Sequence, residues 1–196
     1  MTVSDTGGRF VGNGPLVPDD LEDGIDVDEA DAGSVDATFV GSEITENFDE
    51  GVDLNELGEG GINARFTNVS ATDTADSEGI ALEEHDAGDV VLAMRKVTAT
   101  GNGNDGVEVE ETEDGSVRVD AVGLASSVND ADGLHVEEVA AGDVAISLTG
   151  STITDNDDDG IQAEQGAPGI GTLRLVGSNV SGNLDDQVNL DGVTQI

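Results

Sequence analysis

The chain has 196 residues, with 44 Asp and Glu against 6 Lys and Arg, a formal net charge of −38 and no cysteine. A chain this acidic repels the phosphates of nucleic acids and the surfaces of anionic membranes, so neither is an expected partner. The missing cysteines exclude disulfides and thiolate metal sites, and no stretch approaches the ~20 apolar residues of a membrane span.

The composition fits either one medium domain or a disordered acidic chain, because aromatic residues make up only 2% of it. A repeat decides between the two. One glycine recurs at steps of 27 or 28 residues, at Gly24, Gly51, Gly79, Gly106, Gly133 and Gly160. The repeat predicts a single domain over 1–196, with full coils from about 24 to 186.

The chain before Gly24 matches the second half of a coil, so a partial first coil is expected over 9–23. In this alignment the segment Gly14-Pro15-Leu16-Val17 takes the place of Gly41-Ser42-Glu43-Ile44. A partial last coil is expected over 187–196.

Within each coil, three short apolar segments follow one another. The residues one and three positions after the first glycine are apolar, as in Ile161 and Ala163, which predicts a strand with one buried face. A second glycine, nine residues after the first, opens another alternating run. A third apolar position follows, at Ile44, Val69, Val97, Leu124, Ile153 and Val180.

These features predict an all-β solenoid of about seven coils, with 27 residues and three short strands each. Asn stands four residues before the first glycine in most coils, at Asn47, Asn102, Asn129, Asn156 and Asn183. This Asn column and segments such as Asp159-Gly160-Ile161-Gln162-Ala163 resemble the right-handed parallel β-helix of the pectin-lyase-like superfamily. The resemblance covers nearly the whole chain and implies stacked Asn amides, but the fold leaves the activity open.

Acidic residues occupy fixed positions in every coil. One stands immediately before the first glycine, as in Asp105, and others stand four and five residues after it, as in Glu110 and Glu111. Stacked coils would place like charges ~5 Å apart, at roughly 0.8 kcal/mol per pair in water. Molar salt shortens the screening length to ~3 Å, so the chain resembles a haloarchaeal protein that requires monovalent cations at high concentration.

A calcium site is a further interpretation of the acidic turns. Asp155, Asp157 and Asp159 precede Gly160 in the Asp-x-Asp-x-Asp-Gly order of calcium loops, and carboxylate oxygens suit Ca²⁺. The twelfth position, where an EF-hand places a bidentate Glu, is Gly166. A diffuse cation atmosphere is the competing interpretation.

Catalysis has one candidate pair, Glu108 and His135, which stacked coils would place side by side on an outward face. A carboxylate beside an imidazole suits acid/base chemistry or a metal. The alternative is a surface histidine that only reduces the repulsion between stacked carboxylates. Polygalacturonases carry Gly-His-Gly and Arg-Ile-Lys motifs, which are missing here, and the four Phe residues lie in the N-terminal third, so a glycan would lack an aromatic platform.

We therefore expect a non-catalytic, salt-adapted scaffold or interaction module in a larger cell-surface or virion assembly, able to self-associate through its solenoid ends. It would require no cofactor. The alternative is a divergent carbohydrate-active domain of lyase or hydrolase type. The family resemblance implies an extracellular or surface location, whereas residues 1–5 show no export signal, so location, ligand and oligomeric state stay open.

Overall fold

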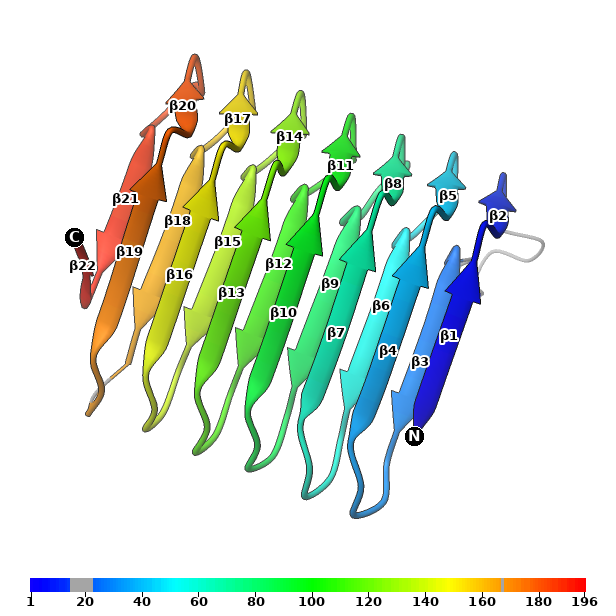
Figure 1. Cartoon of the computed structure of the whole chain (residues 1–196), viewed down its shortest axis with the longest axis horizontal. Coiled ribbons are helices and arrows are strands. Elements are labelled where there is room, and N and C mark those ends of the chain that lie inside the picture. The colour runs from blue at the N-terminus through cyan, green and yellow to red at the C-terminus, as the bar shows by residue number, and fades with distance from the viewer. Residues whose placement is uncertain (15–22, 167) are drawn as a thin grey trace.

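The protein is a parallel β-solenoid. The computed structural model describes residues 1–14, 23–166 and 168–196, and all regular elements in these ranges are strands. The chain passes through three sheets in each coil, and every strand pairs in parallel with the strands one coil away (Figure 1). About six complete coils result, close to the total of about seven that the glycine period predicted. No helix in the described ranges is long and apolar enough to cross a membrane.

Each sheet contains one strand from each coil. The first sheet holds β3 (Ile25–Glu29), β6 (Val52–Glu56), β9 (Ile80–Glu84), β12 (Val107–Glu111), β15 (Leu134–Glu138), β18 (Ile161–Gln165) and β21 (Val188–Asp191). The second sheet holds β1 (Thr2–Thr6), β4 (Val35–Val40), β7 (Ile62–Thr67), β10 (Val90–Arg95), β13 (Val117–Val122), β16 (Val144–Thr149), β19 (Gly171–Val176) and β22 (Val193–Gln195). The third sheet holds β2 (Arg9–Val11), β5 (Glu43–Thr45), β8 (Ser70–Thr72), β11 (Thr98–Thr100), β14 (Ala125–Ser127), β17 (Thr152–Thr154) and β20 (Asn179–Ser181).

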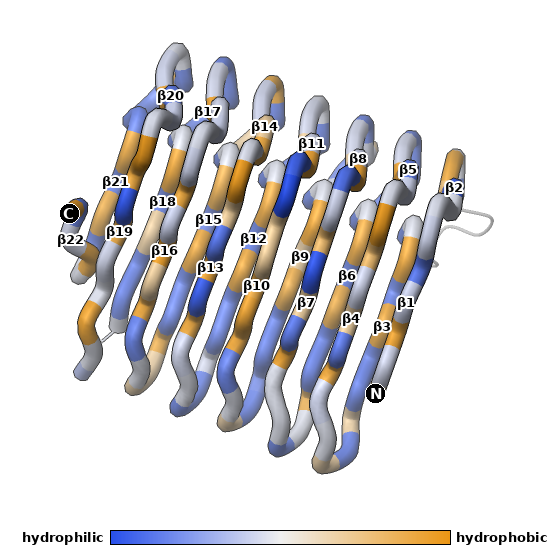
Figure 2. The backbone as a smooth tube through the Cα atoms, in the orientation of Figure 1, coloured by the Kyte–Doolittle hydropathy of each residue, from blue (hydrophilic) through white to orange (hydrophobic). Residues whose placement is uncertain are grey.

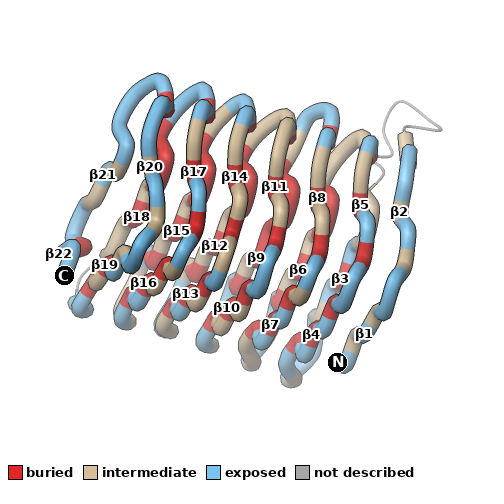
Figure 3. Tube along the Cα trace, turned by 45° about the horizontal axis from the view of Figure 1, so that its top comes forward, coloured by how far each residue is buried: buried red, intermediate tan, exposed pale blue. Residues whose placement is uncertain are grey.

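The core is a column of aliphatic side chains inside the coils. Hydrophobic and hydrophilic residues alternate along the strands (Figure 2), because successive side chains of a strand point to opposite faces. The buried positions form continuous rows through the central coils, whereas the strands at both ends are more exposed (Figure 3). Phe39 and Phe66 stack inside, with ring centroids 5.0 Å apart, and so offer no surface for a sugar.

The Asn column stacks its amides, as predicted. Asn102 Nδ2 donates to Asn129 Oδ1 at 3.0 Å, Asn129 Nδ2 to Asn156 Oδ1 at 2.9 Å, and Asn156 Nδ2 to Asn183 Oδ1 at 2.8 Å. In the coil that lacks the Asn, the amide N–H of Thr74 donates to Asn102 Oδ1 at 3.4 Å. The amides of Asn102, Asn129 and Asn156 therefore each find a partner in the next coil. Asn47 Nδ2 instead donates to the carbonyl oxygen of Phe10, and Asn183 Nδ2 to Gln187 Oε1.

The first partial coil starts earlier than expected. Thr2–Thr6 already forms β1, which pairs with β4, and Phe10 of β2 lies opposite Ile44. The alignment of residues 14–17 with 41–44 is therefore wrong, since residues 7–10 occupy that place; residues 15–17 themselves lie outside the described ranges. Two or three apolar residues are too few to fix the register of so short a strand.

The third apolar column combines two positions. Ile44 lies opposite Ala71 and not Val69. Val69, Val97 and Leu124 are buried at the bend before the strand, where other coils carry serine. Large and small residues thus exchange places between coils, in the pairs Ser42/Ile44, Val69/Ala71, Val97/Ala99, Leu124/Ser126 and Ser151/Ile153, all buried. The exchange keeps the interior filled while the sequence column shifts by two residues.

Candidate functional site

Glu108 and His135 lie together on the outward face of the first sheet, as predicted. They are register partners on β12 and β15, and Glu108 Oε1 lies 3.4 Å from His135 Nδ1. Each side chain retains 19% of its exposure. The imidazole and the carboxylate therefore contact each other in a half-buried position.

Asp105 is a third member of this site that the sequence did not single out. Asp105 Oδ2 also lies 3.4 Å from His135 Nδ1, and the residue is 4% exposed. Every coil carries an acid at this position, so the column alone does not distinguish it. Asp105 could have been identified from its neighbour, because His135 is the histidine of the outward column and lies one coil beyond Asp105.

The two carboxylates determine the charge of the histidine. Burial alone would lower the pKa of His135, but the hydrogen bonds and charges of Asp105 and Glu108 outweigh it and raise the pKa to about 10. The ring is therefore an imidazolium at neutral pH. A protonated imidazole cannot accept a proton, so it is unsuited to act as a general base there.

The acids before the first glycine are buried acceptors of main-chain hydrogen bonds. Asp105 Oδ1 accepts the N–H of Asp132 at 2.6 Å, Asp132 Oδ1 that of Asp159 at 2.7 Å, and Asp159 Oδ1 that of Asp186 at 2.7 Å. Burial, with the charges of Asp105 and Asp159, raises the pKa of Asp132 to about 7. Burial and the charge of Glu108 raise the pKa of Glu78 to about 7. The carboxylates before the first glycine therefore accept main-chain hydrogen bonds between coils, in addition to contributing negative charge.

Two overlapping sets of side chains around His135 have ligand atoms within 4.8 Å of one another. One set is Asp105, Asp132 and His135, and the other is Glu78, Asp105 and Glu108. Carboxylate and imidazole donors are compatible with a divalent cation. The histidine would have to release its proton first, since only neutral imidazole is a ligand.

The three aspartates of the calcium interpretation are used differently. Asp159 is buried and accepts Asn189 Nδ2 at 2.7 Å through its second oxygen. Asp155 and Asp157 are exposed, and Asp155 has a left-handed backbone with φ of 60°. Among the described residues, the acidic cluster that includes Asp159 is formed with Asp132 and Asp158. A calcium loop at 155–160 stays a prediction.

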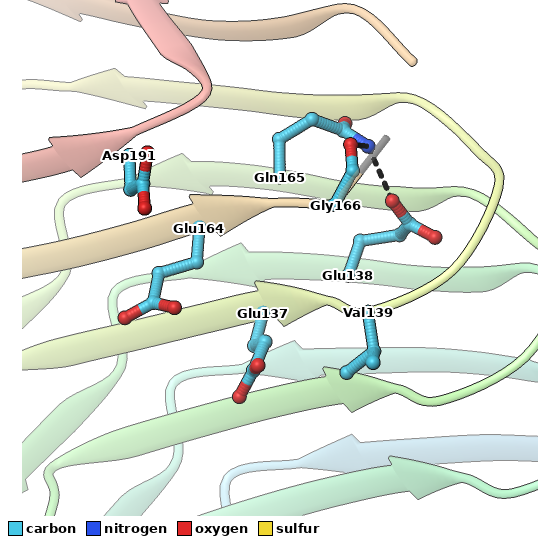
Figure 4. Close-up of a pocket in the computed structure, with 7 residues that line it drawn as sticks. All are labelled: Glu137, Glu138, Val139, Glu164, Gln165, Gly166 and Asp191. Atoms are coloured by element: carbon cyan, nitrogen blue, oxygen red, sulfur yellow. Dashed lines mark hydrogen bonds between the residues drawn. The ribbon is translucent and has the colours of Figure 1, made fainter. Parts of the chain in front are cut away.

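A small acidic pocket of about 150 Å³ lies near the C-terminal end of the first sheet (Figure 4). Glu137, Glu164 and Asp191 line it as successive register partners. Glu138 and Gln165 also line it, and Gln165 Nε2 donates to Glu138. The pocket is much smaller than the ~300–1,000 Å³ of typical ligand pockets.

The acids four and five residues after the first glycine form two ladders on opposite faces. Glu83, Glu110, Glu137 and Glu164 point outward and are half-buried. Glu56, Glu84, Glu111 and Glu138 point inward and are almost completely buried. The expectation that salt screens all these charges is therefore wrong for the inward set, because dissolved ions do not reach buried groups.

Three parallel sheets with an acid-lined first sheet define the chain as an acidic parallel β-solenoid. Comparisons with protein-family models, with curated proteins and with solved structures found no match to this chain. The pectin-lyase-like and haloarchaeal resemblances stay predictions.

Proposed function

We propose that this chain is a non-catalytic, salt-adapted scaffold that presents an acidic sheet within a larger surface assembly. The observation that carries the proposal is the outward ladder of the first sheet, in which Glu83, Glu110, Glu137 and Glu164 follow one another in strict register. Burial and the charges of neighbouring acids raise the pKa of Glu83, Glu110 and Glu137. Such a surface attracts cations and cationic partners.

The state of His135 supports the non-catalytic role. Asp105 and Glu108 both lie 3.4 Å from the same Nδ1 of His135, so the imidazolium offsets one of their two negative charges and the site keeps a net negative charge. The acidic sheet of the scaffold would take up monovalent cations as a diffuse atmosphere. Ca²⁺ would compete more strongly than monovalent cations for the same carboxylate oxygens.

The alternative function is a divergent carbohydrate-active domain, favoured by the 3.4 Å contact between Glu108 and His135. In that case His135 could serve as a general acid, since it carries a proton at neutral pH. The substrate would be an uncharged or cationic glycan, because the acidic sheet repels anionic ones.

A glycan panel separates the two functions. The chain is incubated with neutral and cationic polysaccharides in molar KCl, and released sugars are measured for the wild type and for His135→Ala and Glu108→Gln. We expect no release from any of the three. Release by the wild type that both substitutions abolish would replace the scaffold proposal with the catalytic one. His85→Ala, which changes an exposed histidine, is the control.

A further inference from the structure

The inward acids form a column that the proposed function does not use. The inward glutamate column consists of the last residue of five successive first-sheet strands, each with its side chain pointing inward: Glu29, Glu56, Glu84, Glu111 and Glu138. Glu56, Glu84 and Glu111 have no exposed surface, and Glu138 is 1% exposed. Adjacent members are register partners, so five carboxyl groups stack in successive coils.

In the central coils, one oxygen of each carboxyl group is satisfied by the main chain. Glu56 Oε1 accepts the N–H of Gly58 at 3.2 Å, Glu84 Oε1 that of Asp86 at 3.1 Å, and Glu111 Oε1 that of Glu113 at 3.0 Å. In each case the donor N–H lies two residues after the glutamate, so the three side chains have the same orientation.

In every member, one carboxyl oxygen has no hydrogen-bond partner among the described residues. The unpaired atoms are Oε2 of Glu29, Glu56, Glu84 and Glu111, and Oε1 of Glu138. Each is shielded from solvent. A buried carboxylate oxygen without a donor is among the costliest arrangements in a protein interior, and here it is repeated in consecutive coils.

The described groups around the column supply no compensating positive charge. The turn acids Asp114 and Asp143 add negative charge beside Glu111 and Glu138, and Asp86 and Glu113 lie in the adjoining turns. Of the ion pairs between described residues, none includes a member of the column. Gly115 packs so closely that an added Cβ would lie 3.1 Å from the carboxyl carbon of Glu111. The backbone at Gly115 therefore packs directly against the carboxyl group of Glu111.

We propose that the inward glutamate column is a proton-binding site, in which carboxylic acid groups donate to the unpaired oxygens of carboxylates in adjacent coils. A proton supplies the missing donor, cancels a charge and requires no extra volume. The protons come from solvent when the chain folds.

The titration of the column agrees with this geometry. Burial is the main cause that raises the pKa of Glu84 to about 8 and that of Glu111 to about 7, and it raises the pKa of Glu56 and Glu138 as well. A raised folded-state pKa stabilises the fold fully below the unfolded value near 4.5, and this stabilisation is lost as the pH rises through about 7 to 8. Acidification from pH 8 to pH 5 should therefore stabilise the protein, and molar salt should not abolish the effect.

The test compares Glu111→Gln with Glu113→Gln in molar KCl. Both remove one acid from the same turn region, but Glu113 is exposed. The urea midpoint is measured between about pH 5 and pH 8.5, which spans the titration. We expect the wild type and Glu113→Gln to lose the same large part of their midpoint at high pH, and Glu111→Gln to lose clearly less. Equal losses in all three would overturn the proposal.

Infrared spectroscopy of the wild type gives a second measurement that does not depend on how the variants fold. At pH 7 the folded chain should show the C=O band of protonated carboxyl groups, and the urea-unfolded chain should not. Absence of this band in the folded state would contradict proton binding. Stability that follows added K⁺ or Ca²⁺ at constant pH, with no pH dependence, would assign the column to metal cations instead.

Discussion

Val128 adopts a backbone conformation that its side chain disfavours. Its φ is 59°, in the left-handed region, and it lies in the turn after β14. The same turn in neighbouring coils holds Gly101, Asp155 and Gly182 at similar φ. Glycine, asparagine and aspartate tolerate this region, whereas a β-branched residue is a clear outlier there. Val128 is also 59% exposed, so little packing compensates for the strain.

Replacement of this valine should stabilise the protein. Val128→Asn should raise the free energy of unfolding by about 1 kcal/mol, because it relieves left-handed strain without the chain entropy of glycine. Denaturant unfolding in molar KCl measures the change. Val139→Asn makes the same substitution at an exposed position outside the left-handed region and should have little effect. An equal gain in both variants would show that removal of exposed apolar surface, and not strain, is the cause.

At the scale of the strand, Gln165 ends the inward column. It occupies the position of Glu138 one coil further along and donates from Nε2 to Glu138 and to the carbonyl oxygens of Gly142 and Gly166, both at 2.9 Å. Its Oε1 accepts the N–H of Val144 at 2.8 Å. The amide thus supplies the donors that the glutamates lack.

Gln165→Glu should destabilise the fold in a pH-dependent manner. At pH 8 the oxygen that replaces Nε2 would face a carboxylate and two carbonyl oxygens without a donor, while the other oxygen keeps the N–H of Val144. The free energy of unfolding should therefore fall by on the order of 3 kcal/mol. At pH 5 protonation restores one donor, and part of the loss should be recovered. Unfolding at both pH values in molar KCl checks this.

Gln162→Glu, on the outward face of the same strand, is the matched control for Gln165→Glu. It should show a smaller loss that salt removes, because the new carboxylate would lie on the outward face beside Glu164. A pH-independent loss in Gln165→Glu would contradict the expected role of its donors.

The repeat predicted the strands, their inward aliphatic residues and the Asn stack, because period-two alternation and turn chemistry are local signals. It did not predict that Glu84 and Glu111 turn inward, since a charged residue at a buried position opposes the hydrophobic pattern. Their burial depends on the second glycine column. A Cβ on Gly142 would lie 1.4 Å from the carbonyl oxygen of Gly115, so adjacent coils meet there through bare backbone, which no single-coil pattern reveals.

For the whole molecule, the structure separates the acids four and five residues after the first glycine into an outward and an inward set, whereas the acids before that glycine accept main-chain hydrogen bonds. The outward ladder faces water, so ionic strength acts on it as well as pH, because burial and neighbouring charges raise the pKa of Glu83, Glu110 and Glu137. The inward column is shielded from water, so we expect pH and not salt to act on it. The net charge of −38 therefore overstates the charge that salt must screen, because folding at neutral pH leaves part of the inward column protonated.

Neutralisation of the outward ladder should lower the salt requirement of the fold. In tens of millimolar salt without divalent ions, the wild type should lose β-structure, and molar KCl should restore it, because screening removes roughly 0.8 kcal/mol of repulsion per adjacent pair. Circular dichroism against KCl concentration at pH 8 measures the midpoint. The triple variant of the outward ladder should fold at clearly lower KCl: Glu83→Gln, Glu110→Gln and Glu137→Gln.

The control for this comparison removes the same number of charges from separate exposed turns, with Glu46→Gln, Glu59→Gln and Glu113→Gln. If net charge alone sets the salt requirement, both triple variants should shift equally. If the stacking of like charges sets it, the outward-ladder variant should shift further, because its acids are register partners in consecutive coils. A wild type that keeps its β-structure in dilute buffer would contradict salt adaptation itself, whereas the pH dependence of the inward column would be unaffected.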